Sequence, residues 1–226
     1  MTSRSAKVID AQPTWAPFSG WTVLLENSRE SLGVDARTDG GAAFAEILSQ
    51  SVRNLTSATT AFAALPTDSY HVTLCDGVND GVRTIRDTPS MQYVDPDRVI
   101  GAIGAEVDEL LSAARRPIDW RPESIEVRGH AVVVAMATDE DLTELRTLRT
   151  RLLERIGEMI GTNVTSRWRP HLTIGYLVDG RDADAAGESA DASWKQTSPN
   201  LQAGARLGTA SAGLYRFDDI ATFSRM

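Results

Sequence analysis

The sequence predicts a mixed fold of helices and strands with an internal duplication. Candidate strands alternate with amphipathic helices along most of the chain. Two tetrapeptides of one pattern, His71-Val-Thr-Leu74 and His171-Leu-Thr-Ile174, stand 100 residues apart, and each follows a candidate helix. The chain has no glycine-rich phosphate loop after a strand, and neither a Walker motif nor a GxSxG elbow. These observations favour two related halves over a standard nucleotide-binding sheet.

Size and composition set the class of protein. The 226 residues suit one domain, and 42% hydrophobic with 24% charged residues is typical of a soluble globule. The formal net charge of −8 argues against a long duplex nucleic acid or an anionic membrane as an obligate partner. A small phosphorylated ligand stays open, because it needs only a local pocket.

The single cysteine, Cys75, excludes an intramolecular disulfide and fits a reducing compartment. The first residues have no apolar stretch of signal-peptide length, and no run of 18 apolar residues occurs anywhere. We therefore expect a cytoplasmic protein without a transmembrane helix.

The first half of the chain supplies the following elements. We expect a polar, irregular lead-in at 1–19, a strand at 20–26, a loop at 27–41, a helix at 42–55, a strand at 69–74 and a loop at 76–94. The helix at 42–55 is predicted because Phe44, Ile47, Leu48 and Val52 recur at helical spacing.

The second half continues the alternation. We expect a helix opening at Asp95-Pro96 and ending near 115–117, a long strand at 123–137, a helix at 139–160, a strand at 168–178 and terminal strands at 210–223 turning near 218–219. The helix at 139–160 follows a capping-box pattern in which Thr138 precedes Asp141. The segment 179–200 is rich in Asp, Ala, Gly and Ser and is expected to be mobile, with a short helix possible.

The two tetrapeptides gain meaning from strand geometry. Side chains alternate between faces, so His71 and Thr73 share one face, as do His171 and Thr173. The apolar residues of each motif occupy the other face and can pack on helices. If the halves pack with pseudo-twofold symmetry, two imidazoles and two hydroxyls would point into one groove.

That set of groups suits a phosphodiester. A neutral imidazole can take a proton from an attacking water, and a protonated one can give a proton to the leaving oxygen. Threonine hydroxyls can hydrogen-bond the non-bridging phosphate oxygens. The three histidines are scattered and the lone cysteine has no cysteine neighbour, so we expect no metal and no cofactor. The residues leave open which histidine is the base.

These motifs resemble those of the two-histidine (2H) phosphoesterase superfamily, which includes 2′,5′ RNA ligase-like proteins and cyclic nucleotide phosphodiesterases. The flanking residues Ser69-Tyr70 and Arg169-Pro170 also fit that group. The resemblance spans about 20–225 and implies a bilobal α+β fold, with duplicated sheet-and-helix units around a central groove. It also implies metal-independent chemistry on 2′,3′-cyclic phosphates or 2′,5′ linkages, and it carries over to the two histidines and two threonines only.

Several other residues are candidates for the site or for the core. Arg169 lies two residues before His171 and could bind phosphate or be a solvated charge. Tyr70 and Tyr176 fall opposite the histidines and are expected in the core. Cys75 is expected to be buried and His130 to be structural or exposed. Trp168, Tyr93 and Trp120 are candidate base-stacking platforms or, alternatively, packing residues. Arg146, Arg149, Arg151 and Arg155 are expected to form a solvated helix face, with contact to an RNA backbone as the alternative.

We therefore predict a two-lobed domain over 20–226 that hydrolyses a cyclic or 2′,5′-linked phosphodiester. His71 and His171 are the candidate catalytic residues, and Thr73, Thr173 and Arg169 the candidate substrate-binding residues. The expected partner is a small nucleotide or a short RNA, with no membrane and no long duplex. The alternatives are a non-catalytic nucleotide-binding module, an RNA end ligase and a cyclic oligonucleotide hydrolase. The sequence leaves the oligomeric state open.

Overall fold

The computed structural model describes residue 7 and residues 15–79, 96–160, 167–178 and 183–226. Within these ranges the strands are β1 (Gly20–Glu26), β2 (Phe62–Ala64), β3 (Val72–Asn79), β4 (Ile118–Arg128), β5 (Ala131–Ala137), β6 (His171–Leu177), β7 (Leu207–Thr209), β8 (Ser211–Phe217) and β9 (Phe223–Arg225). The helices are α1 (Asp39–Ala58), the 3-10 helix η1 (Thr67–Ser69), α3 (Pro96–Ala113), α4 (Thr143–Ile160), α5 (Ala183–Gln196) and α6 (Pro199–Gly204).

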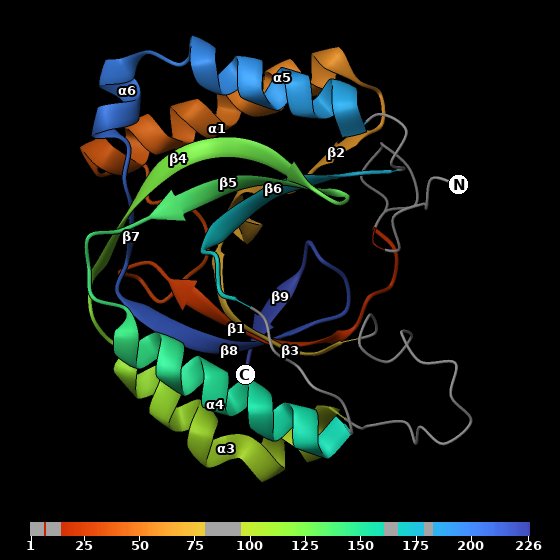
Figure 1. The fold of residues 1–226 in the computed structure, drawn as a ribbon, viewed down its shortest axis with the longest axis vertical. Helices are drawn as coiled ribbons and strands as arrows, with labels where there is room; N and C mark the ends of the chain where they lie inside the picture. Colours follow the sequence, from red (N-terminus) through yellow and green to blue (C-terminus); the bar gives the residue numbers. More distant parts are fainter. Residues whose placement is uncertain (1–6, 8–14, 80–95, 161–166, 179–182) are drawn as a thin grey trace.

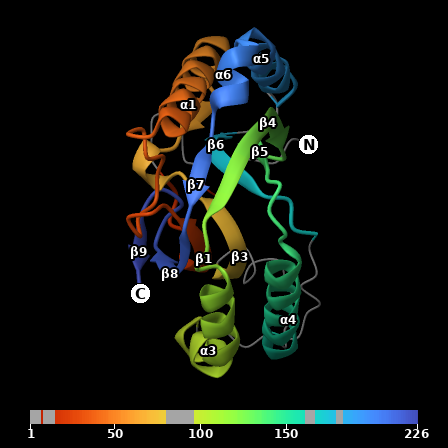
Figure 2. The same ribbon diagram turned by 90° about the vertical axis from the view of Figure 1, so that its left-hand side faces the viewer.

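The strands form one curled antiparallel sheet. Its order is β7-β4-β5-β6-β3-β1-β8-β9, and β2 pairs with β6 beside this path. Helices α1, α5 and α6 lie at the end of the molecule nearest β4 and β5, whereas α3 and α4 lie at the opposite end, next to β1, β3 and β8 (Figures 1 and 2). The predicted mixed α+β fold is confirmed, with one helical layer for each half of the sheet.

Apolar spacing explains why the helices sit on the sheet. Helix α1 buries Phe44, Ile47, Leu48 and Leu55, which recur every three, four or seven residues and so share one face. Thr38 caps this helix by accepting a hydrogen bond from the amide of Gly41 at 3.0 Å. The helix begins before the predicted residue 42, because the cap lies at Thr38. None of the helices among the described residues has the length and apolar character needed to cross a bilayer.

The strand predicted at 123–137 is instead a hairpin. Strands β4 and β5 pair from Arg121 with Ala137 to Arg128 with Ala131, and the turn between them has two residues. Gly129 adopts a φ of +63° there, as the first position of such a tight turn often requires. The prediction missed this turn because a single glycine, between Arg128 and His130, is a weak turn signal next to the apolar run that begins at Ala131.

Two helical predictions need correction. Helix α4 begins at Thr143 rather than at 139, because Asp141 accepts a hydrogen bond from the Thr143 amide at 2.9 Å. The segment 179–200, expected to be mobile, contains α5 and the start of α6, although 179–182 lie outside the described residues. Small residues allow α5 to approach α1 closely, and Ser193 accepts a hydrogen bond from Asn54 of α1 at 3.1 Å.

The remaining elements follow the sequence with shifted ends. The strand predicted at 69–74 begins at Val72, after η1, and continues to Asn79 into the expected loop at 76–94. The rest of that loop, 80–95, and most of the lead-in at 1–19 lie outside the described residues. The predicted strand at 20–26 and the two terminal strands are confirmed. The short strands β2 and β7 were not predicted, since three residues carry too little periodic signal.

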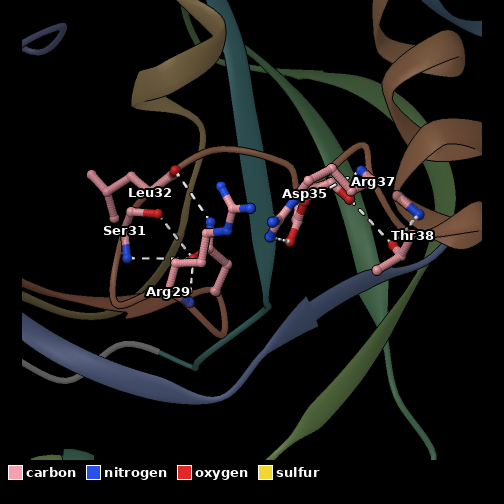
Figure 3. Close-up of polar contacts among 8 residues, drawn as sticks. Arg29, Ser31, Leu32, Asp35, Arg37 and Thr38 are labelled. Carbon is pink, nitrogen blue, oxygen red and sulfur yellow. Dashed lines mark hydrogen bonds and ion pairs between the residues drawn. The ribbon is translucent and has the colours of Figure 1, made fainter.

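The loop between β1 and α1 is held by its own polar groups (Figure 3). The Asn27 carboxamide accepts hydrogen bonds from the amide of Arg29 at 2.9 Å and the hydroxyl of Ser31 at 2.9 Å. Gly33, at a φ of +88°, then donates its amide to the carbonyl of Tyr70 at 2.7 Å. This bond fixes the loop against the residue that directly precedes His71.

Candidate active site

The two tetrapeptides meet in the middle of the sheet. Strands β3 and β6 are antiparallel, and the registered pair between them is Val72 with Leu172, the second residue of each motif. Both side chains are fully buried in the main core. The motifs therefore cross at their own centres, and an approximate twofold axis runs through this one pair.

The register fixes how the four polar side chains lie. One step on either side of the central pair, His71 stands opposite Thr173 and Thr73 stands opposite His171. All four are partly exposed, whereas their apolar neighbours are buried on the other face. Directly opposed side chains lie about 5 Å apart, and diagonal ones about 7–8 Å, within reach of an imidazole. The structure thus brings together the four residues that the sequence analysis proposed.

Both imidazoles are held in the same way. His71 donates its Nδ1 hydrogen to the carbonyl of Ser69 at 2.6 Å, and His171 donates its Nδ1 hydrogen to the carbonyl of Arg169 at 2.9 Å. A carbonyl oxygen only accepts hydrogen bonds, so Nδ1 carries the proton in each neutral ring. Nε2 is then left to accept or donate a proton in chemistry.

A β-bulge lies at the last residue of each motif. Leu74 is the extra residue where β3 pairs with β1, and Ile174 is the extra residue where β6 pairs with β5. Residues 71–75 and 171–175 accordingly share one pattern of buried and partly exposed side chains. A bulge shifts the alternation of faces by one residue. The duplication therefore includes backbone geometry as well as the motif side chains.

The bulge overturns the expectation for Tyr176. Simple alternation places this ring opposite the histidines, but the extra residue at Ile174 returns it to their face, where it is half-exposed. The ammonium of Lys7 lies 5.1 Å from the centre of the Tyr176 ring, and its charge also acts on His71. Tyr70, by contrast, is buried as predicted.

The surroundings of His71 disfavour its charged form. Burial is the largest cause and lowers the pKa of His71 to about 4, while the hydrogen bond to Ser69 opposes this shift. The charges of His171 and Lys7 lower the same pKa further. The ring of Phe223 covers His71 edge-on, with the ring centres 4.7 Å apart. His71 is accordingly neutral at neutral pH.

A buried carboxylate holds the strand that carries Phe223. Glu26 is fully buried and accepts hydrogen bonds from the hydroxyls of Tyr215 at 2.7 Å and Ser211 at 2.9 Å. Arg225, two residues after Phe223, forms an ion pair with Glu26 at 3.0 Å. These contacts tie β9 to β1 and β8. The sequence analysis missed Phe223 and Lys7 because both reach the site from the chain ends without a local pattern.

We expected the arginines of α4 to be solvated, but one of them is buried. Arg149 is buried and donates its Nε hydrogen to the carbonyl of Leu74 at 2.8 Å. Trp168 donates its indole hydrogen to the neighbouring carbonyl of Thr73 at 2.9 Å. Both bonds satisfy carbonyls at the bulge, where β3 diverges from β6. Trp168 and Arg149 thus support the first motif.

The remaining candidate residues lie in the core, in a turn or outside the described ranges. Cys75 is fully buried as expected, and burial raises the pKa of its thiol to about 12. Trp120 is buried and donates to the hydroxyl of Thr209 at 2.9 Å, so it is a packing residue rather than a stacking platform. His130 lies in the hairpin turn, and Tyr93 lies outside the described residues. In the described part of the chain, no three His, Cys, Asp or Glu side chains are grouped closely enough to hold a metal ion.

A cavity of about 670 Å³ lies beside His171. Arg169 and Pro170, directly before His171, line it, and so does Ala135, the register partner of His171 on β5. Its size is that of a small-molecule pocket. Arg169 is exposed and lines this cavity, two residues before His171.

Comparison with known proteins supports the resemblance. The sequence model of the 2'-5' RNA ligase superfamily matches residues 92–203. A conserved protein of unknown function from Agrobacterium tumefaciens has a similar structure, with a TM-score of 0.58, 17% identity and coverage of 97% of this chain and 89% of that chain. Usb1 from Kluyveromyces marxianus is similar with a TM-score of 0.51, 12% identity and coverage of 90% and 95%. No curated protein sequence matches the chain closely enough to count as a relative.

Proposed function

Because the sequence model of the 2'-5' RNA ligase superfamily matches residues 92–203, we propose that the chain is a phosphodiesterase of this superfamily. Its proposed substrate is a cyclic 2′,3′-type or 2′,5′-linked phosphodiester of a nucleotide or short RNA. The observation that carries this proposal is the crossing of the two motifs at the pair of Val72 with Leu172. That crossing supports one shared phosphate site, to which both imidazoles and both hydroxyls contribute in this proposal.

The two histidines divide the proton transfers in this proposal. His71 is neutral and acts as the base, so its Nε2 takes a proton from the water that attacks phosphorus. His171 acts as the acid and gives the Nε2 proton to the oxygen that leaves phosphorus. One phosphorus–oxygen bond forms and another breaks, which leaves a phosphomonoester and a free hydroxyl. Both transfers use groups of this chain.

The threonines hold the phosphate in this proposal. Thr73 and Thr173 stand diagonally across the same face, so their hydroxyls can donate to two different non-bridging oxygens. Such contacts strengthen as negative charge builds on phosphorus and keep the attacking and leaving oxygens in line. Arg169 adds a positive charge at the edge of the same face.

The test is a substrate panel measured with EDTA present. It contains 2′,3′-cyclic mononucleotides, 2′,5′-linked dinucleotides and cyclic dinucleotides. We expect hydrolysis of at least one of the first two classes, and a loss of kcat of about 10²–10⁴-fold in both His71→Ala and His171→Ala. The control is His130→Gln, which changes the one histidine outside the motifs and should keep activity.

The same panel separates the alternatives. Full activity in either motif variant would overturn the proposed roles. Binding of these nucleotides without turnover would identify a nucleotide-binding module instead. Turnover of the cyclic dinucleotides alone, or joining of RNA ends, would point to a different reaction in the same groove.

A further inference from the structure

The cavity beside His171 has an unusual charge for this protein. The chain has a formal net charge of −8, yet this cavity is lined by five arginines and only two glutamates. The arginines are Arg128 on β4, Arg146 and Arg149 on α4, and Arg167 and Arg169 before β6. A local surplus of arginine on an acidic protein indicates a site for an anion.

The cavity continues the face that carries the catalytic histidines. Register pairs run from His171 to Ala135 on β5 and from Ala135 to Ser124 on β4. Paired residues share a face, so these three form one row across the sheet. Two strand spacings separate Ser124 from His171, which is about 10 Å. The alanine between them is small, so a ligand can lie across the row.

Part of the charge is already neutralised inside the cavity. Arg128 donates two hydrogen bonds to the carboxylate of Glu126, at 3.2 and 3.1 Å, and Ser124 donates a third at 3.1 Å. The Arg128–Glu126 pair therefore adds no net charge to the cavity. Arg149 is buried and donates to a backbone carbonyl, which fixes its position without neutralising its charge.

The other three arginines supply the exposed part of the surplus, which exceeds the single charge of Glu123, the second glutamate of the cavity. Arg146, Arg167 and Arg169 are exposed, and none of them forms an ion pair with another residue in the described ranges. By contrast, Arg151 and Arg155, on the same helix as Arg146 but outside the cavity, pair with glutamates. Guanidinium groups match phosphate oxygens in a two-point geometry.

We propose that this arginine-lined cavity binds a second phosphoryl group of the substrate, on the side of the scissile phosphodiester that faces β5 and β4. This inference rests on the proposed function and adds a substrate class to it. The preferred substrate then carries at least two phosphates, as in a dinucleotide that ends in a cyclic phosphate. A lone cyclic mononucleotide fills the histidine site and leaves the arginine site without its anion.

Three substrates with one base composition test this proposal. They are a 2′,3′-cyclic mononucleotide, the same nucleotide with a 5′-phosphate, and a dinucleotide ending in the 2′,3′-cyclic phosphate. We expect kcat/KM to be at least tenfold higher for one of the last two than for the first. The 5′-phosphate arm and the dinucleotide arm distinguish a terminal monoester from an internal phosphodiester as the bound group.

The matched variants locate the effect. Arg146→Gln combined with Arg167→Gln removes two cavity charges from exposed positions, and the preference should then fall to near one. Arg151→Gln removes a charge from the same helix outside the cavity and should keep the preference. An unchanged preference in the double variant, or an equal loss in Arg151→Gln, would overturn the proposal.

Binding separates this inference from the proposed function. The probes are a mononucleotide 3′-monophosphate and a dinucleotide 3′-monophosphate, titrated by calorimetry at several salt concentrations. We expect tighter binding of the dinucleotide, with an advantage that shrinks as the salt concentration rises and is lost in the double arginine variant. If no substrate is hydrolysed but this pattern holds, the proposed function fails and the anion site stands. If hydrolysis occurs and both probes bind equally, the anion site is rejected and the proposed function stands.

Discussion

Removal of the Phe223 ring should raise the pKa of His71. The ring covers the imidazole edge-on at 4.7 Å, and the burial to which it contributes is the largest cause of the low pKa. Phe223→Ala opens that side to water, which stabilises the imidazolium relative to the neutral ring. Phe223→Leu keeps an apolar side chain there and is the matched control.

The magnitude follows from the size of the shift. The pKa of His71 falls from 6.5 to about 4, which corresponds to about 3 kcal/mol at 1.36 kcal/mol per unit. Phe223 is one of several groups that exclude water, so we expect Phe223→Ala to return about one unit of this shift. The base would then titrate near pH 5, and kcat/KM at pH 4.5 should fall about threefold relative to the native chain.

Two measurements check this reasoning. The acidic limb of the kcat/KM profile should move upward in Phe223→Ala and stay in place in Phe223→Leu. Titration of the His71 C2 proton by NMR should show the same difference without any substrate. A limb and an NMR titration that both stay fixed in Phe223→Ala would refute the argument that this ring desolvates His71.

Three further predictions concern stability and are read by urea unfolding. Gly175→Ala should lower the free energy of unfolding by about 1–3 kcal/mol, because a Cβ there would overlap the backbone of β2. Gly101→Ala has open space around it and should raise the free energy of unfolding by about 0.5–1 kcal/mol, so equal effects of the two variants would contradict this. Arg149→Lys should cost about 1.5–3 kcal/mol, since lysine has no Nε–H for the Leu74 carbonyl, and an unchanged midpoint would reject that bond. The pKa of His71 is lower in the folded chain, so the unfolded chain binds more protons between pH 6.5 and about 4. The free energy of unfolding should therefore fall as the pH drops through that window, and it should fall less in His71→Gln.

Much of the fold is readable from periodicity, and the errors have local causes. Helix α1 and strand β1 were predictable because each carries an apolar pattern along its whole length. The β4–β5 hairpin was not, because its turn depends on the positive φ of one glycine, Gly129, and a single glycine is a weak turn signal. Helix α5 was hidden by its composition. Alanine and serine each bury little apolar area, so they give a weak helical pattern. Their small side chains let α5 pack closely on α1, which only the tertiary structure shows.

The candidate site was predictable to the extent that it is local. The alternation of faces and the repeated motif identified four side chains, and the registered pair of Val72 with Leu172 brings them together. The bulges at Leu74 and Ile174 left no signal in the sequence, so Tyr176 was assigned to the wrong face. Phe223 arrives from a strand more than 150 residues away from His71, and no local pattern connects the two.

The duplication supplies two equal groups, and their surroundings make them unequal. Each imidazole donates Nδ1–H to the carbonyl two residues before it and is followed by a bulge at the same position. Phe223 and Lys7 act on His71, whereas in the described part of the chain no aromatic ring stacks on His171, which lies beside the arginine-lined cavity. General acid–base catalysis needs one neutral and one protonated partner at the same pH. A symmetric pair would share both states, so the different surroundings of the two rings are the reason why we propose His71 as the base.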